Sequence, residues 1–303
     1  MLEPSKRDLD KERQSELDRL AKVNAECVAG YQVIRHYIYE QLEDMELEAM
    51  NKYIVNGYTK VYANLKTLIV DSLNEAKVKN VEVVEKLLNL NLRQPKLYKT
   101  LPNTPAFKYT NRVFTKKSVS VRSKKAADAI TQIIADGRNK GLPLTDIKKK
   151  IDIVMGFRDA QGRITSKSKA LIEAGKLTHR NGSIYETYRI ARTEVRRMND
   201  FAKFDSFIDT KKEFSNVRLK LRSDIDGYER TQSRVMNGFV SNTEGKFMYP
   251  DGFYYQKGTQ PGRWSINDRE ELYEVFLNNE ELKNESKRLV KQANEIKQVT
   301  YKK

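Results

Sequence analysis

The sequence has 303 residues, of which 57 are Lys or Arg and 41 are Asp or Glu, so its formal net charge is +16. This length suffices for one large domain or two ordinary ones, because domains usually span roughly 100–200 residues. Hydrophobic residues make up 39% of the chain and charged residues 32%. This balance excludes both a membrane-embedded protein and a wholly disordered one.

The rare residue types narrow the possible chemistry further. The single cysteine, Cys27, excludes an internal disulfide framework and a cysteine-rich zinc site, and two histidines leave little for His-based metal or triad chemistry. No run of apolar residues approaches the ~18 that a membrane-spanning helix needs. The first ten residues lack the apolar region of a secretory signal. We therefore expect a soluble protein of a reducing compartment, with no membrane partner.

The positive charge is concentrated in the middle of the chain. Residues 1–107 and residues 223–303 each contain equal numbers of basic and acidic residues, whereas residues 108–222 contain 28 basic and 12 acidic residues. Such a concentration indicates a surface that meets a polyanion, most simply the phosphates of nucleic acid. The alternative interpretation is a solvated, lysine-rich surface without a polyanionic partner.

Ten basic residues in and near the lysine clusters are the candidate nucleic-acid contacts. They are Lys116, Lys117, Arg122, Lys124, Lys125, Lys148, Lys149, Lys150, Arg196 and Arg197. Lysine binds phosphate as a flexible point charge and reads no base sequence. The aromatic residues interleaved with them, Tyr109, Phe114 and Phe157, are better explained by core packing than by base stacking.

The first ninety residues have a helical pattern. Residues 5–26 predict a charged helix, and residues 31–90 predict long helices with apolar stripes on one face. The two stripes are Ile38, Leu42, Met45, Ala49 and Tyr53, and then Tyr58, Tyr62, Leu65 and Ile69. Gly57 lies between them and predicts a break or kink. We expect a helical hairpin or bundle with its own core, the alternative being a helical arm that docks on an oligomeric partner.

A proline-containing segment follows at 91–123 and predicts a linker or arm, in which 113–121 is a candidate strand or extended stretch. Helices are predicted beyond it, at 124–139, 143–155, 164–175 and 183–210. After residue 215 the sequence pattern is typical of an α+β structure. It predicts strands at 217–222 and 247–249, helices at 228–237 and 267–281, and a polar, frayed or adhesive tail from Lys283.

These elements predict a mainly helical α+β fold. Residues 1–90 form a long-helix region for protein contacts, and 91–123 form the linker. Residues 124–282 form a basic domain that ends in a small α+β part with short strands or a hairpin, and 283–303 form the tail.

Four pieces of the last third occur in a recognisable order. The first is Arg189–Asn199, which contains Ile190-Ala191-Arg192-Thr193-Glu194. It is followed by 226–238, by Glu244–Gly252 and by 261–267. Together they resemble the phage minor head protein family, the head morphogenesis or Mu F-like domain of tailed phages, over about residues 180–270. The residues that carry the resemblance are Arg192, Thr193, Glu194, Arg230, Gly238, Pro250, Gly252 and Trp264.

The resemblance implies a non-enzymatic minor capsid protein of the virion, at the capsid interior or portal vertex and in the host cytoplasm during assembly. Its implied partners are the portal protein, the major capsid protein and packaged double-stranded DNA, with possible self-association and a possible part in DNA ejection. The family's His falls on Ser233 and its two Cys fall on Asp268 and Glu270. Because these replacements cannot form a thiolate–imidazole zinc site, we expect no metal and no cofactor.

The same residues have a physical interpretation beside the resemblance. On a helix, Arg189, Arg192 and Arg196 share one face, which would bind phosphate. The alternative is that Arg192 and Glu194 form buried or half-buried ion pairs that fix the register of the domain. Glu194 is expected to pair with Arg230, and Trp264 is expected to fill a small C-terminal core.

Two other functions stay open. The first is a nuclease or ADP-ribosyl-type transferase that uses Arg192, Glu194 and the carboxylates of Asp224 and Asp226. Against it, the sequence has no glycine-rich phosphate loop. The second is a basic DNA-binding module of cellular origin.

Overall fold

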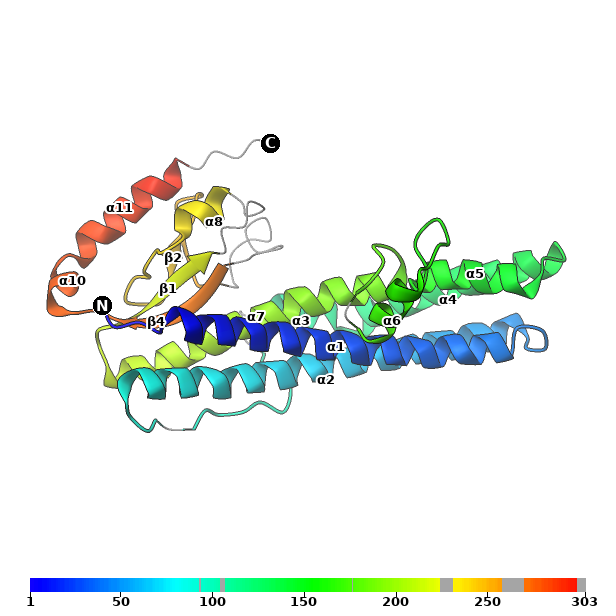
Figure 1. The fold of residues 1–303 in the computed structure, drawn as a ribbon, viewed down its shortest axis with the longest axis horizontal. Helices are drawn as coiled ribbons and strands as arrows, with labels where there is room; N and C mark the ends of the chain where they lie inside the picture. The colour runs from blue at the N-terminus through cyan, green and yellow to red at the C-terminus, as the bar shows by residue number, and fades with distance from the viewer. Residues whose placement is uncertain (93, 104–106, 176, 224–230, 258–269, 299–303) are drawn as a thin grey trace. The chain divides into compact units, whose positions relative to one another are not determined.

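The computed structural model describes residues 1–92, 94–103, 107–175, 177–223, 231–257 and 270–298 (Figure 1). The protein is mainly helical with short antiparallel strands, which confirms the predicted fold class. It forms two compact units. Unit 1 contains residues 1–16, 72–99 and 196–303, and unit 2 contains residues 17–71 and 100–195. The division predicted from the sequence, with boundaries at 90 and 123, therefore differs from these interleaved units.

The helices and strands have the following bounds. The helices are α1 (Lys6–Glu40), α2 (Leu47–Leu88), α3 (Lys108–Val113), α4 (Lys116–Asn139), α5 (Leu144–Met155), α6 (Ser166–Glu173), α7 (Gly182–Glu213), α8 (Thr231–Met236), α10 (Asn279–Lys283) and α11 (Glu285–Lys297). The strands are β1 (Val217–Ser223), β2 (Phe247–Met248), β3 (Tyr254–Tyr255) and β4 (Glu270–Phe276). Among these described residues, no helix combines the length and apolarity that crossing a bilayer requires.

Unit 2 is built on the close approach of α1 and α2. Gly57 lies inside α2 and not at a break. A Cβ at this position would stand 2.7 Å from the side chain of Ile34, so the glycine lets α1 and α2 approach closely. The predicted stripe from Tyr58 to Ile69 is buried, and the ring of Tyr58 meets that of Tyr31 edge-on at 5.0 Å. The stripe before it is interrupted by the turn at 41–46, so Ala49 is exposed.

The predicted strand or arm at 113–121 is wrong, because α4 begins at Lys116. Thr115 caps the helix by accepting a hydrogen bond from the Ser118 N–H at 3.2 Å, and a capping hydroxyl favours a helix start. The buried side of α4 consists of Ser123, Ala127, Ile130, Ile134 and Gly137. Their three- and four-residue steps give α4 one inward face and leave the opposite face to solvent.

Unit 1 contains the two small sheets. β1 pairs antiparallel with β4, with Val217 opposite Phe276 and Ser223 opposite Glu270. β2 pairs with β3 around the turn at Pro250–Gly252, where Gly252 has a φ of +83°. The predicted strands at 217–222 and 247–249 are thus confirmed.

The predicted helix at 267–281 is wrong over its described part, which contains strand β4 and only the start of α10. Leu272 and Tyr273 are both buried, so apolar residues face both sides of β4, and such a run does not distinguish strand from helix. This segment is a strand because it pairs with β1. The predicted frayed tail is also wrong up to Lys297, because α11 buries Ala293 and Ile296.

Candidate nucleic-acid interface

Four of the candidate lysines lie on the solvent-facing side of α4. Lys116 and Lys117 form its first turn, and Lys124 and Lys125 lie two turns further along; all four are exposed. The first turn contains no acidic residue. A helix start carries partial positive charge, so the two lysines add to a local preference for anions.

The second cluster lies on α5. Lys149 and Lys150 are exposed, whereas Lys148 is half-buried, with its ammonium 5.1 Å from the ring centroid of Tyr39. Helix α5 packs on α4 through Gly137, where the side chain of Ile147 occupies the space that a Cβ would need. Both lysine clusters therefore belong to one packed helix pair within unit 2.

A buried carboxylate fixes α5 to α1. Asp152 is 3% exposed and accepts hydrogen bonds from the Arg35 guanidinium at 2.6 and 3.0 Å and from Arg158 at 3.3 Å. The Tyr39 hydroxyl also bonds to Asp152 and lies 3.0 Å from the carbonyl oxygen of Lys148. Burial, followed by the bond to Asp152, raises the pKa of Tyr39, so the phenol stays protonated. This network holds the backbone that carries Lys148–Lys150.

Arg122 is half-buried and already has protein partners. Its guanidinium lies 3.1 Å from a carboxylate oxygen of Glu186 and donates to the carbonyl oxygen of Val113 at 2.9 Å. It joins α4 to α7 and to the end of α3. A phosphate would therefore compete with Glu186 for this side chain.

Arg196 belongs to a different place from the lysines. It lies in unit 1, 2.8 Å from Glu16 and 3.9 Å from Glu271. Burial alone would lower the pKa of Arg196, but the charges of Glu16, Asp200 and Glu271 outweigh it and raise the pKa. Its side chain is only 16% exposed and is engaged in these ion pairs, which is not the phosphate-binding role predicted for it. Its neighbour Arg197 is half-buried.

Several cations of unit 1 form ion pairs. In unit 1, Lys77 pairs with Asp205, Lys203 with Glu12, Arg218 with Glu285, Lys220 with Glu3 and Arg222 with Asp10. In unit 2, six of the candidate lysines are exposed and have no carboxylate within ion-pair distance among the described residues. These six, called the lysine face below, are Lys116, Lys117, Lys124, Lys125, Lys149 and Lys150.

The lysine face has the features of a surface for duplex phosphates. Lys117 and Lys124 lie about 10 Å apart along the helix axis, at about 1.5 Å per residue. Duplex DNA carries one charge per about 1.7 Å of its axis, so a row of this length can meet several phosphates. Neither α4 nor α5 contains an aromatic residue. A stacking platform for single-stranded bases therefore does not occur on these two helices.

The residues that carry the family resemblance are spread over both units. Glu194 is buried in unit 2 and accepts a hydrogen bond from the Thr110 hydroxyl, while Arg192 is exposed and Thr193 half-buried. Gly238 and Gly252 both have φ of +83°, and Pro250 lies in the hairpin turn. Arg230, Trp264, Asp224 and Asp226 lie outside the described residues, and so does the predicted pairing of Glu194 with Arg230.

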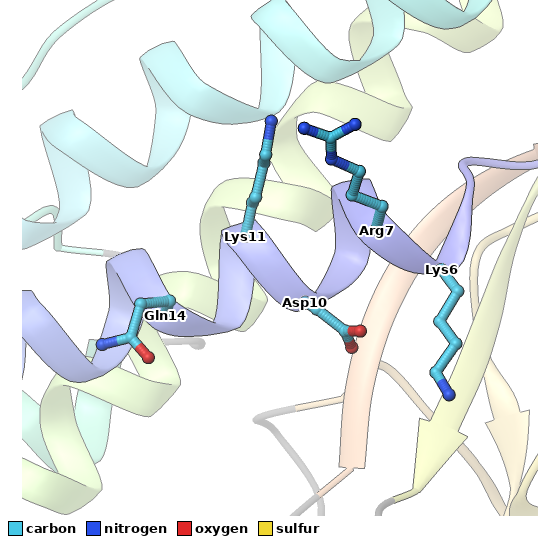
Figure 2. Close-up of a pocket in the computed structure, with 5 residues that line it drawn as sticks. All are labelled: Lys6, Arg7, Asp10, Lys11 and Gln14. Carbon is cyan, nitrogen blue, oxygen red and sulfur yellow. The ribbon is translucent and has the colours of Figure 1, made fainter.

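The sequence interpretation did not include the basic residues at the start of α1. Lys6, Arg7, Asp10, Lys11 and Gln14 line a shallow depression of about 560 Å³, in which Arg7 and Lys11 project to the same side of the helix (Figure 2). Arg222 bonds to Asp10 at 2.7 Å and lowers its pKa. The net charge of residues 1–107 gave no sign of these cations, because acidic residues are interleaved with them.

A more enclosed cavity of about 590 Å³ lies between α2, α7 and the segment 92–98 in unit 1. Its buried cation, Lys77, lies 2.5 Å from Asp205 and donates to the carbonyl oxygen of Lys96 at 2.5 Å. The Lys77 ammonium also lies 4.6 Å from the centroid of the Tyr98 ring. Within the part of the chain that is described, no group of three His, Cys, Asp or Glu residues could hold a metal ion.

Known proteins contribute no relative. No family model matches the sequence, and no curated protein or solved structure matches it.

Proposed function

We propose that this chain is a non-enzymatic structural protein of the phage minor head type, which binds double-stranded DNA without sequence preference through the lysine face of unit 2. The observation that carries the DNA part is the set of six exposed lysines that lack ion-pair partners among the described residues. The ordered motifs between 189 and 267 support the virion part.

Electrostatics specifies how this binding should behave. If about six phosphates are neutralised, the logarithm of the association constant should fall with the logarithm of salt concentration with a slope of about −5. Affinity should then drop about a thousandfold between about 50 and 200 mM salt. Duplexes of unrelated sequence should bind equally, because lysines on these helices meet phosphates rather than base edges.

Two matched variants test the position of the interface. The first variant, on α4, replaces four lysines by Gln: Lys116, Lys117, Lys124 and Lys125. The second variant, on α10 and α11, replaces four others by Gln: Lys283, Lys287, Lys291 and Lys297. All eight lysines are exposed, so each variant loses the same charge from helix surfaces. We expect the salt slope to become shallower by about 3 to 4 in the α4 variant only. Equal losses in both would mean that net charge, not the lysine face, determines binding.

The virion part has its own experiment. The purified chain is incubated with tailed-phage portal protein assemblies and with empty procapsids, and co-sedimentation is measured. Retention by either assembly supports the head-protein proposal, and the α4 variant should be retained equally because the lysine face is assigned to DNA. Cleavage of the DNA, or binding of one defined sequence, would instead favour the enzymatic or the cellular DNA-binding alternative.

A further inference from the structure

Glu274 is a buried acid that has no cationic partner in the part of the chain that the structure describes. It lies in β4, opposite Leu219 of β1, and is 5% exposed. Among the described residues, no Lys or Arg lies within ion-pair distance of it, and its Oε2 has no hydrogen-bond partner. An isolated buried carboxylate is costly, so such a group favours its protonated form.

The groups that face Glu274 come from α7 and α1. The hydroxyls of Ser206 and Thr210 on α7 act to lower its pKa, and Asp209 on the same helix adds negative charge. From α1, Glu12 adds negative charge as well; Lys203 lies 2.7 Å from Glu12, and Lys212 lies 2.6 Å from Asp209. Opposite Glu274, β1 presents the apolar Leu219. Ionisation of Glu274 would therefore place a third negative charge in this cluster.

Three residues of α7 that surround Glu274 also line a cavity, so this region has space to rearrange when Glu274 ionises. Ser206, Asp209 and Thr210 line the 590 Å³ cavity between α7, α2 and segment 92–98. This side of α7 is consequently less closely packed than its apolar side, where Phe207 is fully buried. We propose that Glu274 is a proton-dependent contact between β4 and α7, which packs tightly when the carboxyl group is neutral and opens towards this cavity when it ionises.

The pH range follows from the burial. Burial raises the pKa of Glu274 to about 7, although the hydrogen bonds from Ser206 and Thr210 oppose the shift. Because the pKa in the folded state lies above the unfolded value of about 4.3, the stabilisation is fully present below pH 4 and is lost as pH rises through 7. Between pH 6 and pH 8 the population of the open state should grow about tenfold.

The test compares amide hydrogen exchange in 204–213 and 270–276 for the intact chain and Glu274→Gln, at equal pH so that intrinsic exchange rates cancel. The unmodified chain should exchange faster than Glu274→Gln at both pH values, and the ratio of the two exchange rates should grow about tenfold from pH 6 to pH 8. Glu280→Gln, an exposed acid in α10, is the control and should behave like the unmodified chain. The same ratio at both pH values would overturn the proposal.

Two further variants keep Glu274 in place, in case Glu274→Gln does not fold. Asp209→Asn removes a neighbouring negative charge and should move the transition to lower pH. Thr210→Val removes a hydrogen bond that favours the ionised form and should move it to higher pH. Shifts in these opposite directions identify Glu274 as the titrating group. An unchanged midpoint in both variants would exclude it.

Discussion

The hydroxyl of Tyr39 on α1 hydrogen-bonds to Asp152 on α5, so a residue near the end of the first helix holds the helix that carries Lys148–Lys150. Tyr39→Phe should lower the free energy of unfolding by about 1–2 kcal/mol, because a buried charged acceptor loses a donor. Asp152→Asn should cost about 3 kcal/mol or more, since it removes the partner of two guanidinium groups. Denaturant unfolding measures both. Tyr37→Phe is the control and should change stability by less than about 0.5 kcal/mol.

The ion pair between Arg122 and Glu186 gives a prediction about DNA affinity. Glu186→Gln frees the guanidinium for phosphate and should raise affinity about two- to fivefold at low salt, since an exposed pair is worth up to about 1 kcal/mol. Glu82→Gln in unit 1 is matched, because Glu82 pairs with Lys79 at 2.7 Å and is equally exposed. Fluorescence anisotropy with a labelled duplex compares them. A loss of affinity in Glu186→Gln would show that Arg122 needs this partner to face DNA.

A glycine provides a third prediction. Gly175 has a φ of +69°, and a Cβ at this position would stand 2.4 Å from the backbone nitrogen of Ala25. Gly175→Ala should therefore destabilise unit 2 by more than about 2 kcal/mol, through both strain and steric overlap. Gly141 separates the two causes, because its φ is +62° but no atom of the described residues lies within 4 Å of the added atom. Gly141→Ala should cost only about 1 kcal/mol, and thermal unfolding of both variants distinguishes the contributions.

The buried pair of Lys203 and Glu12 in unit 1 predicts non-additive changes. Lys203→Met leaves a buried carboxylate unpaired and should cost about 3–5 kcal/mol. Adding Glu12→Leu should restore most of this loss, since an apolar pair of similar volume is tolerated at such sites. Lys212→Met, which breaks the exposed pair with Asp209, should cost less than about 1 kcal/mol. Additive losses in the double variant would mean that Lys203 stabilises unit 1 by packing alone.

The sequence predicted those parts of the fold whose residues have one clear period. The stripe from Tyr58 to Ile69 and the alternation in 217–222 both led to correct elements. It did not distinguish helix from strand at 270–276, where apolar residues face both sides and the antiparallel partner lies some fifty residues away. The prediction for residues 113–121 was wrong for a local reason. Their β-branched residues suggested an extended chain, but Thr115 caps the start of a helix.

The exposure of most candidate lysines was predictable from the sequence, but the partners of the candidate arginines were not. The clusters at 116–125 and 148–150 indicated exposed lysines, and six of these residues are exposed. Charge spacing could not show that Arg196 lies beside Glu16, because the two are far apart in the sequence. The shared helical face predicted for Arg189, Arg192 and Arg196 was a local property. Exposure, which differs between Arg192 and Arg196, depends on the packing of distant segments.

The interleaved units also constrain the order in which the chain can fold during synthesis. All of unit 2 is present once residue 195 has left the ribosome, whereas unit 1 needs residues from the beginning and from the last third of the chain. The first residues must therefore wait for β4, to which Leu2 bonds through its backbone N–H and carbonyl at 2.9 Å. A fragment that ends near residue 195 should accordingly carry the lysine face, and a fragment that starts at residue 196 should lack the helix segments that complete unit 1.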